Sequence, residues 1–155
     1  MNVVAVSNDR GEVVNADLLA AAEGVHRQLR PHLPSGYVER MKVIFAGGAE
    51  MAVAETAGRV SGIAVFRIIE KTFTGRELYC DDLVTDDKQR STGVGRALMQ
   101  YMERIAKERG CDWFALDSGC QRQQAHKFYF REGMTVTAFH FSKTVAEKPE
   151  GLNSR

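Results

Sequence analysis

The stretch from Leu78 to Gly110 constrains the fold more than any other part of this chain. It begins with Leu78–Thr85, whose apolar and β-branched residues suit a largely buried strand. Asp86–Gln89 then break the apolar run and turn the chain outward. From Val94 onward, apolar residues recur at the spacing of one helix face, and Gly110 stands where a helix end is expected. The segment therefore predicts a strand, a charged loop, a turn and a long amphipathic helix.

The turn before that helix has the chemistry of an anion-binding site. A helix N-terminus offers unpaired N–H groups and the positive end of the helix dipole. Gly93 and Gly95 have no side chains to obstruct a ligand, and Arg90 and Arg96 supply cationic donors suited to phosphate oxygens. Ser91 and Thr92 are predicted as N-caps of the helix. We interpret the turn as a cradle for a diphosphate.

Two common nucleotide motifs do not match this turn. A Walker loop ends in Gly-Lys-Ser/Thr, whereas Gly95 is followed by Arg96 and Ala97. A Rossmann fingerprint requires a third glycine three residues after Gly95, where Leu98 stands. The diphosphate ligand therefore needs a different binding motif.

The rest of the chain predicts an α/β fold with a mixed sheet. Glycine-containing turns favour an antiparallel meander of the middle strands, and the strand–helix–strand order after residue 77 predicts one parallel pair. We expect a central, mostly antiparallel sheet flanked by helices. The expected strands are Val3–Val6, Met51–Thr56, Val60–Ile69, Glu77–Thr85, Asp112–Asp117 and Met134–Lys143, and the expected helices are 17–29, 37–45, 94–109 and a short one around Ala125–Tyr129.

Composition places the chain among ordinary globular proteins. Its 155 residues, 44% hydrophobic, predict a single domain over 1–146 and a flexible tail over 147–155. A formal net charge of +1 gives no reason to expect nucleic acid as a partner, and no apolar run is long enough for a membrane span. Cys80, Cys111 and Cys120 lack metal-ligand spacing, so we expect no metal, small core thiols and a cytoplasmic location.

A second motif makes the ligand more specific. Ala125-His126-Lys127-Phe128-Tyr129 is followed by Gly133-Met134, at a suitable distance from the glycine turn. Together with Arg-x-x-Gly-x-Gly at Arg90–Gly95, this pattern resembles the GNAT superfamily of acyl-CoA-dependent N-acyltransferases, over roughly Val60 to Lys143. The wider sequence is similar to a bacterial branch of that superfamily whose members are mostly described only generically.

The resemblance implies an N-acetyltransferase. Such an enzyme moves an acetyl group from acetyl-CoA to a primary amine of a small molecule or peptide, by direct attack in a ternary complex. The alternative is a noncatalytic acyl-CoA-binding or sensing module. A homodimer is common in the family, and the resemblance is the ground on which one is expected here.

The resemblance also assigns roles to residues. Main-chain groups near the end of the Leu78–Thr85 strand would pair with the pantetheine arm, the glycine turn would hold the diphosphate, and the short later helix would approach the coenzyme. Tyr129 would be the general acid that protonates the leaving thiolate. The implied coenzyme-binding residues are Leu83, Val84, Thr85, Arg90, Ser91, Thr92, Gly93, Val94, Gly95, Arg96, Arg122 (or its neighbour Gln121) and Phe128.

The residue that removes the amine proton stays open. Asp82 and Asp117 are the named candidates, and Asp81 is expected on the opposite face of the strand from Asp82. His126 and His140 have suitable intrinsic pKa values, and a chain of water molecules is an equal alternative. The carboxylates weakly favour a cationic acceptor.

Overall fold

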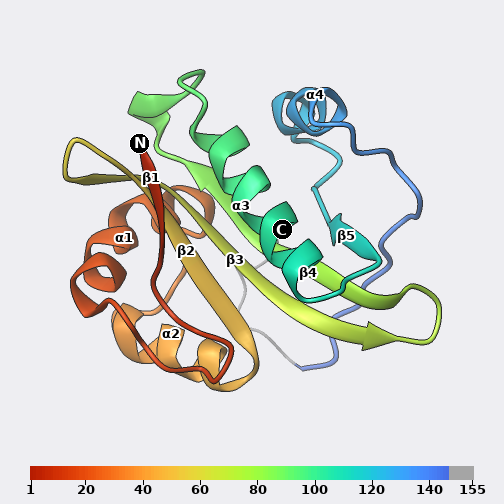
Figure 1. Ribbon diagram of the computed structural model, residues 1–155, viewed down its shortest axis with the longest axis horizontal. Helices are drawn as coiled ribbons and strands as arrows, with labels where there is room; N and C mark the ends of the chain where they lie inside the picture. The colour runs from red at the N-terminus through yellow and green to blue at the C-terminus, as the bar shows by residue number, and fades with distance from the viewer. Residues whose placement is uncertain (147–155) are drawn as a thin grey trace. The chain divides into compact units, whose positions relative to one another are not determined.

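The computed structural model describes residues 1–146, which form two units that are described separately below. The first unit, residues 1–116, is a five-stranded sheet in the order β1-β2-β3-β4-β5 with three α-helices (Figure 1). Its elements are β1 (Asn2–Ala5), α1 (Ala16–Leu29), α2 (Tyr37–Ala46), β2 (Ala49–Thr56), β3 (Arg59–Lys71), β4 (Gly75–Thr85), the 3₁₀ helix η1 (Asp87–Gln89), α3 (Val94–Glu108) and β5 (Trp113–Leu116).

The strand pairing confirms the predicted sheet. β1 to β4 are antiparallel to one another in sequence order, and β5 lies parallel to β4. The β2–β3 turn takes positive φ at Ala57 and Gly58, and the β3–β4 turn takes it at Gly75. Short turns of this kind join strands that lie next to each other, whereas the parallel β5 needs the crossover through α3. The mixed sheet follows from these two kinds of connection.

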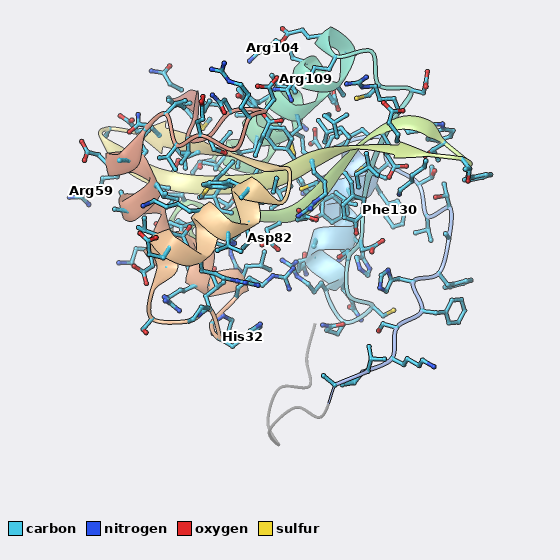
Figure 2. The ribbon with its side chains drawn as sticks, turned by 90° about the horizontal axis from the view of Figure 1, so that it is seen from below. His32, Arg59, Asp82, Arg104, Arg109 and Phe130 are labelled. Carbon is cyan, nitrogen blue, oxygen red and sulfur yellow. The ribbon has the colours of Figure 1, made fainter. Side chains whose placement is uncertain are left out.

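Helices cover both faces of the sheet. The main core cluster packs α1 and α2 against β2 and β3, and its largest fully buried side chains include Tyr37, Phe45 and Met51. The opposite face is covered by α3, whose buried side chains are Val94, Leu98, Met99, Met102, Ile105 and Ala106. Figure 2 shows α3 above the sheet and α1 and α2 below it. The sheet is therefore the middle layer of three.

The second unit begins at Asp117 and contains α4 (Gln123–Arg131), the predicted short helix. The predicted strand at Met134–Lys143 is wrong, because residues 134–146 form neither helix nor strand. A strand exists only where a neighbouring strand supplies hydrogen bonds, and no described segment pairs with this one. The tail expected at 147–155 lies outside the described residues.

Two further findings concern membrane-spanning helices and the burial of the cysteines. None of the helices within residues 1–146 is long and apolar enough to cross a membrane. The thiols of all three cysteines are free, but only Cys80 is buried; Cys111 is half-buried and Cys120 exposed, so the prediction that all three are core residues is wrong. Cys120 lies in the loop between β5 and α4.

Candidate active site

The open edge of β4 is the first component of the site. β5 pairs with β4 only along Glu77–Cys80 and ends at Leu116. The remaining residues of β4 pair with β3 on one side, up to Thr85 opposite Gly62. Within the described chain no strand pairs with their other side. The predicted coenzyme-binding residues Leu83, Val84 and Thr85 therefore have a main-chain edge open to an extended ligand.

A β-bulge at Asp81 changes the direction of the side chains before that edge. Val65 of β3 pairs with Asp82, whereas the next residue, Phe66, pairs with Cys80, so Asp81 is an extra residue in β4. Phe66 contacts Tyr101 of α3 across the sheet face that α3 covers, and Val65 belongs to the core cluster with α1 and α2. The bulge thus moves Asp82 from the α3 face to the α1–α2 face.

This bulge corrects one prediction. Asp81 and Asp82 do not alternate across the sheet; both carboxylates bind cations on the α1–α2 side. Asp81 accepts a hydrogen bond from Arg67 Nε at 2.8 Å, and Arg67 also reaches the carbonyl oxygen of Gly47 at 3.5 Å. An extra residue in a strand breaks the two-residue period on which the prediction rested.

Asp82 is the centre of a polar network that crosses the first unit. Its Oδ2 lies 2.9 Å from His26 Nε2, and its Oδ1 accepts a hydrogen bond from Arg30 Nε at 2.8 Å. His26 Nδ1 lies 3.0 Å from the Tyr37 hydroxyl. Because an ionised carboxylate only accepts hydrogen bonds, His26 carries its proton on Nε2, and Tyr37 donates to Nδ1. The order of donation is Tyr37 to His26 to Asp82.

The network holds Asp82 ionised. Burial alone would raise the pKa of its carboxyl, but the hydrogen bonds from His26 and Arg30, together with the charge of Arg30, outweigh burial and lower that pKa below its ordinary value. Burial, followed by the charges of Glu23 and Asp82, raises the pKa of Tyr37. Tyr37 therefore stays protonated and acts as a donor.

Sequence reasoning missed His26 and Arg30. The available signal was a histidine in the buried face of a predicted helix. His26 is 1% exposed among Leu19, Ala22 and Val25, and a buried imidazole requires hydrogen-bond partners. Its partner Asp82 is 56 residues away in the chain, so the sequence did not identify the pair.

The turn between β4 and α3 forms the second component. Gly93, with φ +88°, is the N-cap of α3 and makes no side-chain capping hydrogen bond. The prediction that Ser91 or Thr92 caps the helix is wrong. Ser91 takes a positive φ of 63°, and the Thr92 hydroxyl donates to the carbonyl oxygen of Gln89 at 2.6 Å. Arg90 is exposed and pairs with Asp87.

The start of α3 is open to an anion. The first turn contains no acidic residue, and its exposed Arg96 is the predicted cation. The nearest atom to a Cβ built on Gly93 would be Met1 Cε at 4.0 Å, so the space beside Gly93 is unfilled. Unpaired N–H groups, the helix dipole and this space suit a phosphate group. The residues present therefore fit the diphosphate that the sequence predicts.

The other predicted residues lie in the second unit. Tyr129 and Phe128 are half-buried neighbours on α4 with ring centroids 5.5 Å apart, and Arg122 is the N-cap residue of α4. Asp117 Oδ2 lies 2.7 Å from His140 Nδ1, so two of the candidate bases form one pair. The structure brings Leu83–Thr85 and Arg90–Arg96 together along one continuous path in the first unit.

The described residues contain no cluster of three or more His, Cys, Asp or Glu side chains that could hold a metal ion. Cys80, which is the residue before the bulge, is 3% exposed. Burial, with the charges of Asp82 and Asp81, raises the pKa of its thiol, so the thiol stays protonated. A protonated, buried thiol is a poor nucleophile.

Comparison with known proteins identifies a family for this chain. A family model described as the acetyltransferase (GNAT) family matches residues 18–134. The uncharacterized N-acetyltransferase YhdJ of Bacillus subtilis is 31% identical over 104 residues, which cover 66% of this chain and 68% of that protein. The aminoalkylphosphonate N-acetyltransferase of Salmonella typhimurium is 28% identical over 91 residues, covering 59% of this chain and 57% of that protein.

Solved structures share the fold. An aminoglycoside N-acetyltransferase crystallised in complex with CoA superposes with a TM-score of 0.78 at 16% identity, covering 94% of this chain and 95% of that one. An acetyltransferase of Trypanosoma brucei gives a TM-score of 0.71 at 20% identity, covering 93% of this chain and 99% of that one.

Proposed function

The chain belongs to the acetyltransferase (GNAT) family of enzymes, and on that premise we propose that it transfers an acetyl group from acetyl-CoA to a primary amine by direct attack in a ternary complex. One observation carries the proposal. The edge of β4 that β5 leaves open leads through the short helix η1 to the turn at Gly93 and the start of α3, which has no side-chain cap. An extended arm and a diphosphate need such features in that order.

Coenzyme binding is proposed along this path. Main-chain groups of Leu83, Val84 and Thr85 would pair with the amides of the pantetheine arm. The N–H groups from Arg90 to Arg96 would hold the diphosphate, with the two arginines neutralising its charge. Arg122 and Phe128 of the second unit are proposed as further coenzyme contacts, as the family resemblance implies.

The chemistry is proposed to need one hydrogen-bond donor to the oxyanion and one general acid. Attack of the amine on the thioester carbonyl builds an oxyanion, which a main-chain N–H near Leu83 and Val84 would stabilise. The bond from carbon to sulfur then breaks, and Tyr129 would protonate the leaving thiolate, whose thiol has an ordinary pKa of about 8.5. Direct attack needs no covalent enzyme intermediate, and the buried, protonated Cys80 thiol is a poor nucleophile for forming one.

The amine must first lose a proton, because its pKa is about 10.4 in the free state. Asp82 and Asp117 remain the proposed candidates. The lowered pKa of Asp82 makes its carboxylate a weaker base than an ordinary aspartate side chain, since it already accepts hydrogen bonds from His26 and Arg30. The pairing of Asp117 with His140 therefore favours that pair as the proton acceptor.

A small-molecule amine is the proposed acceptor. The aminoalkylphosphonate N-acetyltransferase named above and a thialysine N-epsilon-acetyltransferase of Sus scrofa carry the names of small amines. The carboxylates that favoured a cationic acceptor are already paired, Asp81 with Arg67, Asp82 with Arg30 and Asp117 with His140. They no longer favour a cationic acceptor over a neutral or anionic one. The cytoplasmic location and the homodimer stay predictions.

A calorimetric titration with acetyl-CoA tests the coenzyme site. We compare the parent protein with Gly93→Glu and with the matched control Gly93→Ala, which carries the same backbone strain at φ +88° without the charge. We expect the parent to bind and the Glu variant to lose at least about ten-fold more affinity than the Ala variant, because a carboxylate would oppose the diphosphate.

The parent protein is then incubated with acetyl-CoA and each of a panel of small primary amines, and a free-thiol assay measures the CoA released. Release of CoA that depends on the amine supports transfer. A parent protein that does not bind acetyl-CoA would refute the proposed function. Equal losses in the two Gly93 variants would show that the diphosphate lies elsewhere.

A further inference from the structure

Side chains of α1 and of its C-cap residue, Arg30, hold both ends of the open β4 edge. At one end, His26 and Arg30 bind the Asp82 carboxylate. At the other end, Gln28 Nε2 donates to Asp86 Oδ1 at 3.0 Å, and Gln28 Oε1 accepts from the main-chain N–H of Asp87 at 2.9 Å. Asp82 and Asp86 directly flank Leu83, Val84 and Thr85. Figure 2 shows Asp82 on the side of the sheet that α1 and α2 cover.

These contacts do more than packing requires. The apolar face of α1, formed by Leu19, Ala22 and Val25, already fills the core beneath the sheet. An apolar residue at position 26 would fill the same space without the need for polar partners. His26 instead receives a hydrogen bond from Tyr37 and donates one to Asp82, which fixes the direction of the carboxylate. The result is a polar link from α2, through α1, to the bulge in β4.

Gln28 needs a separate explanation, because it is exposed. An exposed glutamine loses side-chain freedom when it is held, and it recovers little stability from hydrogen bonds that compete with water. Both the amide nitrogen and the amide oxygen of Gln28 are nevertheless hydrogen-bonded to the segment between β4 and the cradle. Asp86 also binds the N–H of Lys88, so Gln28 holds the residue that starts η1.

We propose that His26, Gln28 and Arg30 are positioning residues that hold the Leu83–Thr85 edge and the cradle in the geometry that acetyl-CoA requires. This inference rests on the proposed function. When the main-chain edge is already ordered before binding, the cost of ordering it does not reduce the binding free energy of the ligand. The three residues need not touch the coenzyme. They act through Asp82, Asp86 and Asp87.

Gln28 provides the test, because its exposed side chain can be changed without opening the core. We compare Gln28→Ala with Gln100→Ala, an exposed glutamine replaced on α3, by calorimetric titration with acetyl-CoA and by melting temperature. We expect roughly five-fold weaker binding for Gln28→Ala, the equivalent of about one lost hydrogen bond, and parental binding for Gln100→Ala. Both melting temperatures should stay within about 2 °C of the parent value.

Gln28→Glu separates positioning from general packing. Its side chain is the same size, but its carboxylate would face Asp86, so we expect weaker binding than for Gln28→Ala. A KM for acetyl-CoA that rises in the order Gln, Ala, Glu, with a nearly constant KM for the amine, supports the inference. A purely structural role would change the melting temperature in that order and leave coenzyme affinity unchanged.

The two proposals can fail separately. If the parent binds acetyl-CoA and Gln28→Ala binds it equally well, the positioning role is refuted while the proposed function stands. If the parent does not bind acetyl-CoA, the proposed function fails and the positioning role fails with it.

Discussion

At the scale of single residues, Asp82 connects the stability of the first unit with the proposed chemistry. Its side chain is 15% exposed and is bound by one imidazole and one guanidinium. A charged group this far from water is stabilised by its partners, and removing a partner leaves the remaining groups unsatisfied. Asp82 therefore holds His26 and Arg30 in place. The strength of these two interactions depends on whether the Asp82 carboxyl is ionised.

The lowered pKa of Asp82 predicts an acid-sensitive contribution to stability. Because the folded protein holds this carboxyl ionised more strongly than the unfolded chain, its contribution is full above the unfolded pKa of about 3.9 and is lost as pH falls below that value. We expect Asp82→Asn to lower the melting temperature by several degrees at pH 7, for a loss of about 1–3 kcal/mol. The difference from the parent should shrink steadily below about pH 4.

Melting curves between pH 2.5 and 7.5 check this prediction. Glu39→Gln is the control, because Glu39 is an exposed carboxylate, 76% accessible, that pairs with Lys42 on the surface of α2. A constant difference between Asp82→Asn and the parent across the range would contradict the role given to the carboxylate.

Tyr129 carries the prediction for catalysis. Tyr129→Phe removes one hydroxyl and leaves the ring that contacts Phe128. We expect turnover to fall by about 10²–10⁴-fold, the usual contribution of general acid catalysis, with acetyl-CoA affinity nearly unchanged. Turnover by Tyr129→Phe equal to that of the parent from pH 6 to 9 would show that another group protonates the thiolate.

At the scale of elements, the start of α3 lies directly on β3. A Cβ built on Gly62 would lie 2.5 Å from Val94 Cγ1, 3.0 Å from the Val84 carbonyl oxygen and 3.1 Å from Leu98 Cδ1. The absence of a side chain at Gly62 lets the first turn of the helix approach the sheet beside the open edge of β4. One residue of β3 thus sets how closely the turn proposed to bind the diphosphate approaches the sheet.

Gly62→Ala should therefore damage both stability and coenzyme binding. The added methyl group has a backbone oxygen on one side and two branched side chains on the other, and overpacking of this kind costs about 1–3 kcal/mol. We expect a lower melting temperature and weaker binding of acetyl-CoA, measured by scanning fluorimetry and calorimetry.

Gly24→Ala is the matched control for that substitution. Gly24 lies inside α1 with no atom within 4 Å of a built Cβ. Replacing a glycine in a helix interior should stabilise the protein by about 0.5–1 kcal/mol and leave coenzyme binding unchanged. Equal behaviour of the two variants would contradict the close approach of α3 at Gly62.

At the scale of the whole molecule, the described chain divides into a layered first unit and a second unit with little regular structure. In the second unit, Phe139 and Phe141 are 83% and 90% exposed within residues 134–146. By contrast, Phe45 and Phe66 in the first unit are nearly fully buried in elements of the fold. Protease sensitivity should follow this contrast, because proteases cut exposed chain without regular structure first.

We expect brief chymotrypsin treatment to cut after Phe139 or Phe141 before it cuts after Phe45 or Phe66. Mass spectrometry of the first fragments measures the order. Protection of Phe139 and Phe141 in the intact protein would contradict the prediction. If that protection disappears on dilution, a second copy of the chain covers the segment.

Local patterns in the sequence determined much of the first unit. The strand–turn–helix segment appears where the residues place it, because its signals act between near neighbours: an apolar and β-branched run, apolar residues at the spacing of one helix face from Val94, and the glycine at position 110, which takes φ +67°. The meander and the parallel crossover follow from the lengths of the connections. The strand, turn and helix along the path from Leu83 to Arg96 were therefore predictable, and the coenzyme-binding role of that path stays a prediction.

Tertiary structure alone decided what depends on distant partners. The bulge at Asp81 exists because of how β4 pairs with β3, and it reverses the side of the sheet that Asp82 occupies. His26, 56 residues from Asp82, joins it only once α1 lies against β4. The segment at 134–143 has the composition of a strand but no described partner. Propensity acts on each residue by itself, whereas pairing, bulges and buried polar networks depend on which segments the folded chain brings together.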